Sequence, residues 1–292
     1  MGISLRFNCF IIGICICDAV VSWDPMMLYR YRVEDVENVS SHQTRMDNPQ
    51  KSLRFTEHIE TVLMGVKLAK IDDFPYHVAI EHVPTGLHMC SGAILTADVV
   101  ITAANCLIGT DKEDLLIRVG SAARGKGGRK RKVIEIHIHP EYDENLPADI
   151  ALLKLRRKLN FSHKIQPVTL PSVEDPLFTD MEMNVTGWSF VNNDYMHATF
   201  LRYATVQIMD RDECMLYTQN VLKDITTPSM ICAGIGDEKT GCLGDSGSPL
   251  VLDRRLYGIA SHGTPGCIEQ IYPTVYTRIT GHRDWIFRIS DA

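Results

Sequence analysis

The sequence predicts an all-β protein, either a barrel or a sandwich, over most of its 292 residues. Short runs rich in β-branched side chains recur from about residue 62 onward, and Gly, Pro and Asp separate them. The runs are YHVAI, SGAIL, DVVITA, LLIRVG, KVIEIHIH, DIALLKL, YATVQI, SPLVL and LYGIASH. Helical apolar spacing occurs only in residues 282–289, HRDWIFRI, so we expect one helix at the C-terminus.

The first 19 residues have the layout of a secretory signal peptide. Arg6 precedes an apolar run over residues 7–17, and small residues follow near Ala19. A membrane anchor is the alternative, but this run is about half of the roughly 20 residues that a spanning helix needs. We therefore expect residues 1–19 to be removed, the product to be secreted to the extracellular space, and no membrane span.

Two further regions follow the signal peptide. Residues 20–61 are polar and mixed in charge, without cysteine or sustained periodicity, and they predict an N-terminal extension or propiece. Residues 62–292 carry the strand runs and form the expected globular domain. The composition, 45% hydrophobic and 23% charged, is typical of soluble globular proteins.

Cysteine usage predicts disulfides. Three of the nine cysteines lie in the signal peptide, and an even set of six remains in an exported chain. A metal site is the alternative, but no C-x-x-C pair or His/Cys cluster has ligand spacing, so we expect no metal. Six cysteines admit fifteen pairings, among which spacing alone does not choose. They are Cys90, Cys106, Cys214, Cys232, Cys242 and Cys267.

The charge is unevenly distributed. The chain has a formal net charge of -6, although six basic residues fall within residues 124–132. The acidic remainder argues against general nucleic-acid binding, and the basic loop is a candidate site for sulfated glycans or acidic protein segments. A solvated hairpin tip is the alternative. The six residues are Arg124, Lys126, Arg129, Lys130, Arg131 and Lys132.

The most specific motif is GCLGDSGSP, residues 241–249. Glycines on both sides of Ser246 let the backbone turn sharply, so that the hydroxyl projects while nearby N–H groups converge on one point. Such a convergence is what an oxyanion hole requires.

Several motifs occur together in a fixed order. ITAANC spans residues 101–106 and DIALLKL spans residues 149–155, both ahead of the Ser246 motif. FPY, HPEY, TGW and DWI begin at residues 74, 139, 186 and 284. With these motifs, residues 62–292 resemble the chymotrypsin/trypsin family of serine proteases. The resemblance implies two six-stranded antiparallel β-barrels, an active-site cleft between them and a C-terminal helix.

The resemblance also implies roles for single residues. Ser246 matches the nucleophile, Asp149 the carboxylate that orients the base, and the N–H groups of Gly244 and Ser246 the oxyanion hole. Asn105 stands at the position of the base histidine, and an amide has no basic nitrogen at neutral pH. We therefore expect an inactive homologue. The implied disulfides are Cys90–Cys106, Cys214–Cys232 and Cys242–Cys267.

Another histidine is the alternative base. His262, in the SHG segment of residues 261–263, stands where relatives line the substrate groove. His88 matches a histidine near the lower edge of the cleft, and His139 belongs to a surface turn. An active endopeptidase with an unusual base therefore stays open as a second interpretation.

Activation and specificity also depart from the family. Relatives are cut after a basic residue, and the new ammonium pairs with the aspartate before the serine, here Asp245. The matching cut site has Thr61, which predicts a persistent zymogen-like form. At the substrate pocket, Thr240 matches the floor and Gly263 and Thr274 the walls, which favours small or apolar side chains.

These observations predict a secreted, inactive serine protease homologue that acts by protein binding, as an adaptor, cofactor or decoy in an extracellular proteolytic pathway. Its expected partner is an extracellular protease, protease substrate or inhibitor, and no cofactor is expected. The alternatives are a serine endopeptidase and a polyanion- or glycan-binding module. Sequons at Asn38, Asn160 and Asn184 fit a secreted glycoprotein.

Overall fold

The computed structural model describes residues 66–143, 148–188, 198–218, 229–234, 245–262 and 273–292. All of them belong to one compact unit, residues 50–292, and residues 1–49 form a separate unit. The expected signal peptide, the extension and the cut site at Thr61 lie outside the described residues. Within the described ranges, no helix is long and apolar enough to cross a membrane.

The first barrel is closed by six antiparallel strands in the order β2-β3-β4-β7-β6-β5. Side chains such as those of Ile80, Ile101, Ile117 and Leu153 have no exposed surface and fill its core. Two 3-10 turns follow β4, namely η2 (Asn105–Leu107) and η3 (Lys112–Asp114). The strands are β2 (His77–His82), β3 (Leu87–Ile94), β4 (Val99–Thr102), β5 (Leu115–Val119), β6 (Arg129–Ile138) and β7 (Ala151–Leu155).

The second barrel also has six strands, in the ring β8-β9-β10-β13-β12-β11, and the pairing of β11 with β8 closes it. A short strand, β1 (Lys67–Leu68), adds to the outer edge of β9. Met183, Val206, Leu250 and Tyr276 are among its buried core residues. The strands are β8 (Glu182–Gly187), β9 (Arg202–Ile208), β10 (Met230–Gly234), β11 (Pro249–Leu252), β12 (Arg255–His262) and β13 (Thr274–Arg278).

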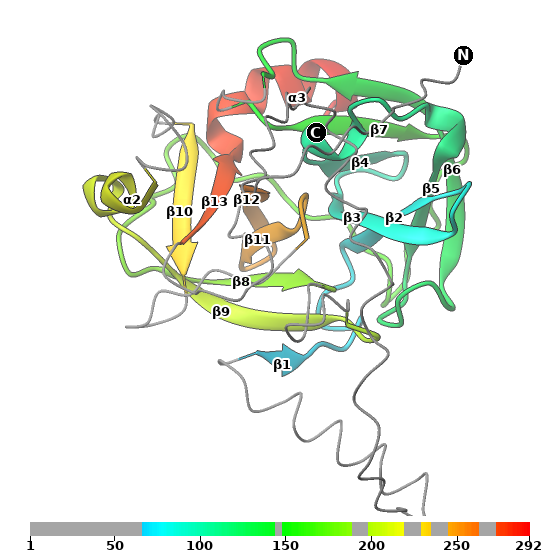
Figure 1. The fold of residues 1–292 in the computed structure, drawn as a ribbon, viewed down its shortest axis with the longest axis horizontal. Coiled ribbons are helices and arrows are strands. Elements are labelled where there is room, and N and C mark those ends of the chain that lie inside the picture. Colours follow the sequence, from blue (N-terminus) through cyan, green and yellow to red (C-terminus); the bar gives the residue numbers. More distant parts are fainter. Residues whose placement is uncertain (1–65, 144–147, 189–197, 219–228, 235–244, 263–272) are drawn as a thin grey trace, which may run out of the picture. The chain divides into compact units, whose positions relative to one another are not determined.

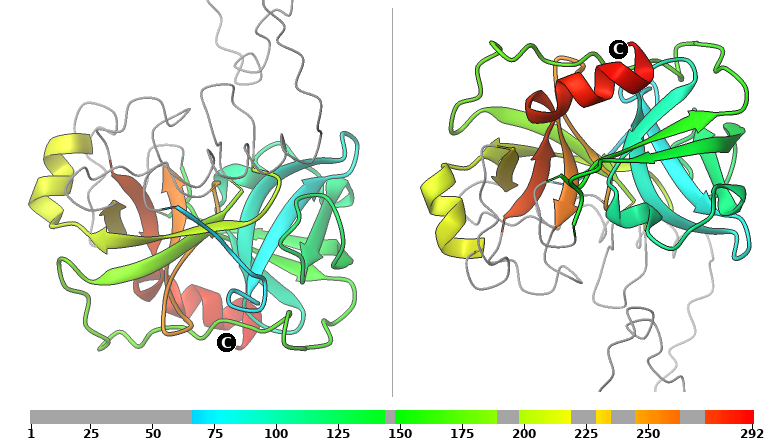
Figure 2. Two further views of the ribbon diagram at one scale, coloured as in Figure 1. Left: turned by 90° about the horizontal axis from the view of Figure 1, so that it is seen from below. Right: turned by 90° about the horizontal axis from the view of Figure 1, so that it is seen from above.

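The chain ends in the turn η6 (Ile279–His282) and the helix α3 (Arg283–Ser290). Figure 1 shows the two barrels side by side, and Figure 2 shows α3 lying across their junction. Trp285 and Ile286 bury their side chains in the same core cluster as the first barrel. The expected fold of two six-stranded antiparallel barrels with a C-terminal helix is confirmed.

A second helix, α2 (Arg211–Thr218), was not predicted because its apolar spacing is weak. Its start is fixed by polar groups instead. The Asp210 carboxylate accepts the N–H groups of Asp212 and Glu213 at 2.9 and 3.2 Å, which satisfies two donors that a helix start leaves open. The Cys214–Cys232 disulfide joins α2 to β10.

Candidate functional site

Asp149 lies just before β7 and is 1% exposed. Its carboxylate accepts three hydrogen bonds, from the backbone N–H and the side-chain Nδ2 of Asn105 at 2.8 and 2.7 Å and from the Ser261 hydroxyl at 2.5 Å. Its backbone carbonyl accepts the hydroxyl of Thr277 at 2.8 Å. A buried carboxylate is tolerated when several donors replace its water, and these donors meet that requirement.

Asn105 opens η2, directly after the strand β4 and beside the Cys90–Cys106 disulfide. Its Nδ2 donates to Asp149 and also to the Ser261 carbonyl oxygen, at 3.0 Å. Both partners are oxygen atoms that can only accept hydrogen bonds. The NH₂ group of the amide must therefore point toward them, and this assigns the positions of Nδ2 and Oδ1. The amide therefore uses both hydrogens structurally, and its other end is a carbonyl oxygen that is not a base at neutral pH.

Ser246 lies in a turn just before β11, and this turn is held between the two barrels. The Ser246 carbonyl accepts the N–H of Ser91 at 3.0 Å, and the Gly247 N–H donates to the Ala260 carbonyl at 2.8 Å. Gly247 has φ +84°, and a Cβ there would collide with the Ser91 carbonyl and the Thr102 hydroxyl. Only glycine fits this close approach, so the GDSG motif serves the backbone geometry of the turn.

Asp245 is held by groups that the sequence did not identify. Its Oδ2 accepts the Ser91 hydroxyl at 3.1 Å and the Trp188 backbone N–H at 3.0 Å, and it lies 2.8 Å from Nε2 of His88. The His88 and Asp245 side chains are 1% and 6% exposed. His88 was expected only near the cleft edge, and Ser91 directly follows the paired Cys90, so sequence order gave no sign of this contact.

His77 lies beside this cluster and joins the barrels. Its Nδ1 is 2.7 Å from the Thr186 hydroxyl of β8, and its ring packs against Trp188 with centroids 4.9 Å apart. Burial lowers the pKa of His77 to about 3, and the repulsion of His88 adds to this shift against the attraction of Asp245. His77 is therefore neutral at physiological pH.

Some of the other expected site residues lie within the residues that the structure describes, and others lie outside them. Thr274 begins β13 and is buried. Cys90–Cys106 and Cys214–Cys232 are paired as the resemblance implies. The residues outside the described ranges are Gly244, Thr240, Gly263, Cys242 and Cys267, and the side chain of His262 also lies outside them. In the described residues no group of three His, Cys, Asp or Glu side chains could hold a metal ion.

Two of the three sequons are described. Asn160 is exposed in the segment after β7. Asn184 lies within β8, where its Oδ1 accepts the Thr205 hydroxyl at 3.2 Å. The third residue of that sequon, Thr186, is fully buried against His77. Asn160 is therefore the accessible acceptor of the two, and Asn38 lies outside the described residues.

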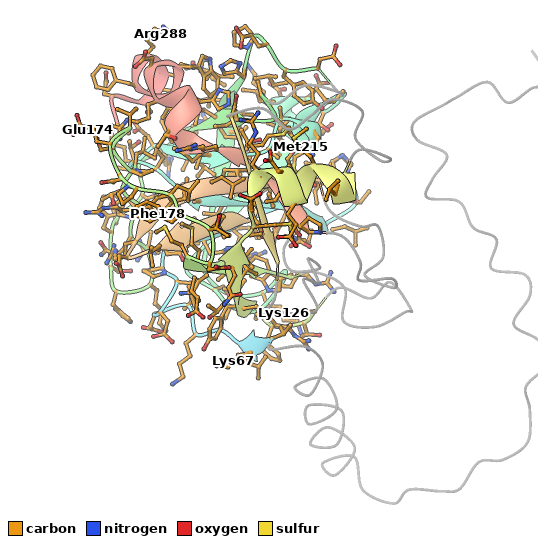
Figure 3. The ribbon with its side chains drawn as sticks, turned by 90° about the vertical axis from the view of Figure 1, so that its left-hand side faces the viewer. Lys67, Lys126, Glu174, Phe178, Met215 and Arg288 are labelled. Atoms are coloured by element: carbon orange, nitrogen blue, oxygen red, sulfur yellow. A yellow bond between two sulfur atoms is a disulfide. The ribbon has the colours of Figure 1, made fainter. Side chains whose placement is uncertain are left out.

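The described hollows lie away from Ser246 and Asp149. One of about 270 Å³ is bounded by α2, β10 and the segment that contains Phe178, with Met209 and Met230 among its lining residues. Figure 3 shows Phe178 and Met215 on this face. None of the residues that line this hollow contributes to the hydrogen bonds around Asp149 or Asp245.

Comparisons with known proteins agree with the fold. The trypsin family model matches residues 63–286. Trypsin 5G1 of Aedes aegypti is 34% identical over 75% of this chain and 82% of its own, and Hypodermin-B of Hypoderma lineatum is 35% identical over 77% and 86%. Among solved structures, the scabies mite inactivated protease paralogue S-D1 matches with a TM-score of 0.70 at 26% identity, covering 78% of this chain and 98% of its own. Mouse neuropsin, titled a serine protease, matches with a TM-score of 0.66 at 26% identity, covering 77% and 98%.

Proposed function

This chain belongs to the trypsin family of serine proteases, and we propose that it acts by binding another protein and does not cleave peptides. The observation that carries the proposal is the amide of Asn105, whose Nδ2 is held by Asp149 and the Ser261 carbonyl. Peptide cleavage by a serine needs a group that takes the hydroxyl proton and returns it to the leaving amine. Asn105 can do neither.

The expected loss of rate is large. In enzymes with this triad, removal of one member leaves only about 10³ to 10⁴ over the uncatalysed reaction. That residual rate is too slow for a protease that must turn over substrate in a pathway. The Asp149 carboxylate has a structural role in this proposal, because it accepts hydrogen bonds from Asn105 and Ser261.

The surroundings of Asp245 support a zymogen-like form. A new N-terminal ammonium at Val62 would have to compete for a carboxylate that already accepts the Ser91 hydroxyl and the Trp188 N–H and contacts His88. The residue before Val62 is Thr61, and Lys51 and Arg54 lie too far upstream to give the usual new end, so a trypsin-like activator has no obvious target at this site. In this proposal the chain lacks the base, and it is not cleaved to give the ammonium group that would pair with Asp245.

A secreted adaptor, cofactor or decoy in an extracellular proteolytic pathway is the role that fits best. The signal-peptide pattern and the two described disulfides support export to an oxidising compartment. The scabies mite structure is titled an inactivated protease paralogue, so loss of activity in this fold has a named precedent. The partner in this proposal is an extracellular protease or a substrate or inhibitor of one.

A serine endopeptidase with an unusual base is the second candidate. It is favoured by the names of the relatives, which are trypsins and other proteases, and by the intact Ser246 and Asp149. It requires a base other than Asn105 within hydrogen-bond reach of the Ser246 hydroxyl. His262 is the residue to test, because its neighbour Ser261 already contacts Asp149.

The decisive experiment restores the histidine. Thr61→Arg allows cleavage before Val62, and Asn105→His added to it should create peptidase activity and fast labelling by a phosphonofluoridate. The cleaved Thr61→Arg protein that keeps Asn105 should stay inactive, and Asn105→His with Ser246→Ala is the matched control. The second candidate would be established instead if the cleaved Thr61→Arg protein, which keeps Asn105, were active and if adding His262→Ala abolished that activity.

A further inference from the structure

A second basic run lies beside the basic hairpin strand. The N–H of Arg156 donates to the Lys132 carbonyl at 2.9 Å, directly beyond the last paired residues of β6 and β7. A guanidinium nitrogen of Arg131 lies 3.5 Å from the Lys158 carbonyl. The runs 129–132 and 156–158 are distant in sequence but adjacent on the surface, and together we call these seven residues the basic seam.

The basic seam is exposed and poorly neutralised. Six of its seven residues are exposed, including Lys130 at 52% and Lys158 at 77%, and Arg131 is half-buried. Glu81 lies 3.8 Å from Lys130 but is already bonded by Arg118 at 2.5 and 3.0 Å, and Asp98 lies 3.9 Å from Lys158. Further along β6 the charges are mixed, because Glu135 lies 3.9 Å from Lys154 and η3 contributes Lys112, Glu113 and Asp114.

The hairpin that carries the seam is held in one conformation. The buried Arg118 guanidinium donates to the Gly127 carbonyl at 2.5 Å, and the Ser121 hydroxyl donates to the Lys126 carbonyl at 2.7 Å. Arg124, in the middle of the segment between β5 and β6, donates its Nε to the Ala198 carbonyl at 3.0 Å and so joins the hairpin to the second barrel. A ligand of the seam therefore meets cations whose backbone is already ordered, which lowers the entropic cost of binding.

The placement of Lys132 and Arg156 is unfavourable for stability. Like charges on directly opposite residues of neighbouring strands destabilise a sheet. The fold nevertheless places these two cations side by side, with Lys130 and Arg157 close by in the sequence. Such a concentration of like charge is relieved when a polyanion binds across it.

We propose that the basic seam binds a sulfated glycan. All seven residues are Lys or Arg, and charged residues are depleted in the buried cores of protein–protein interfaces. The acidic remainder of the chain disfavours nucleic acid. A chain of regularly spaced sulfates matches two parallel rows of cations. This site differs from the loop predicted from sequence, because it includes residues 156–158 and uses Arg124 as a tether.

The test compares two variants of equal charge. Lys130→Ala/Lys132→Ala/Arg156→Ala removes three exposed cations of the seam, and Arg211→Ala/Arg255→Ala/Arg288→Ala removes three from α2, β12 and α3. Figure 1 shows α2 on the opposite side of the described region from β6. We expect the seam variant to bind immobilised heparin at least about tenfold more weakly, and the control variant to stay within about twofold of the unmodified chain.

A second readout separates binding from folding. The seam variant should unfold at an equal or higher temperature than the unmodified chain, because like-charge repulsion is removed. Heparin should raise the melting temperatures of the unmodified chain and of the control variant, and leave that of the seam variant nearly unchanged. Equal losses of heparin binding in both variants, retention by the seam variant, or unchanged binding to desulfated heparin would overturn the proposal. If the seam bound double-stranded DNA more tightly than heparin, the proposal would be wrong and the ligand would be a nucleic acid. None of these outcomes depends on peptidase activity, so they do not test the function proposed for Ser246 and Asn105.

Discussion

At the scale of single residues, Asn105 shows how an amide can satisfy a buried carboxylate. The amide places an N–H donor on Oδ2 of Asp149 and a second one on the Ser261 carbonyl. Relatives place an imidazole at this position, which orients toward the same carboxylate. An amide at this position leaves the buried carboxylate satisfied and, under the function proposed above, does not transfer a proton.

Removing this amide should cost stability. Asn105→Ala takes one of three donors from the Asp149 carboxylate and one donor from the Ser261 carbonyl, and we expect a loss of about 1–3 kcal/mol in the free energy of unfolding. Asn105→His should cost less, because Nδ1–H can donate to Asp149. Urea unfolding at pH 7 measures both, with exposed Asn160→Ala as the control, expected within about 0.5 kcal/mol of the unmodified chain. An Asn105→Ala protein as stable as this control would contradict a structural role for the amide.

At the scale of elements, the β5–β6 hairpin depends on one buried ion pair. Arg118 on β5 is 6% exposed, and its guanidinium bonds Glu81 of β2 through two nitrogens while it also holds the Gly127 carbonyl of the hairpin tip. One side chain thus connects two neighbouring strands and the tip that follows them.

Breaking this pair should be more harmful than replacing it. Glu81→Ala leaves the Arg118 guanidinium buried without its carboxylate, and the expected loss is about 3–5 kcal/mol in the free energy of unfolding. Glu81→Leu with Arg118→Met removes both charges and should lose much less. Chemical denaturation of the two variants decides between them. If the double variant proved no more stable than Glu81→Ala, the loss would come from packing or from the Gly127 contact.

Sequence reasoning predicted elements whose signal is local. The strand runs, the C-terminal helix and the turn at Ser246 each carry their pattern within a few consecutive residues. The helix α2 was missed because Asp210 and a disulfide fix it, not apolar spacing. The sequence analysis identified residues 129–132 of the basic seam but not residues 156–158. The second run lies beside the first only because β7 pairs with β6. Periodicity shows that strands exist and does not show which strands become neighbours.

At the scale of the whole molecule, polar contacts join the two barrels around the candidate site. Asn105 of the first barrel donates to Ser261 of the second, His88 contacts Asp245, and His77 contacts Thr186. Such contacts pair residues more than a hundred positions apart. The pairing of Asp149 with Asn105 was predictable from a familiar motif, whereas the contact of Asp149 with Ser261 and the contacts of Asp245 and His77 depend on how the barrels meet.

The His77 contact should make stability sensitive to acid. The folded pKa is about 3 and the unfolded value about 6.5, so below pH 6.5 the unfolded chain binds more protons than the folded chain. Stability should be constant above about pH 7 and should fall by roughly 1.4 kcal/mol per pH unit from this group between pH 6.5 and 3. His282, whose pKa burial lowers to about 4, adds to the same trend.

Urea midpoints measured from pH 7.5 to 4.5 would show this decline. His77→Gln should make it shallower, because glutamine does not titrate and can still bond the Thr186 hydroxyl. Asn or Gln at an exposed histidine such as His163 is the matched control and should leave the slope unchanged. An unaltered slope in His77→Gln would assign the acid sensitivity to other groups.

The way Asn105 binds Asp149 also has an evolutionary consequence. Nδ2 of Asn105 donates to Asp149, and the Nδ1–H of an imidazole can donate to the same carboxylate, so Asn105→His needs no new acceptor in the core. Both asparagine codons become histidine codons through a single change of their first base. A lineage that keeps this arrangement therefore stays one point mutation away from regaining the base, and any pressure against unwanted proteolysis falls on the activation site at Thr61 as well.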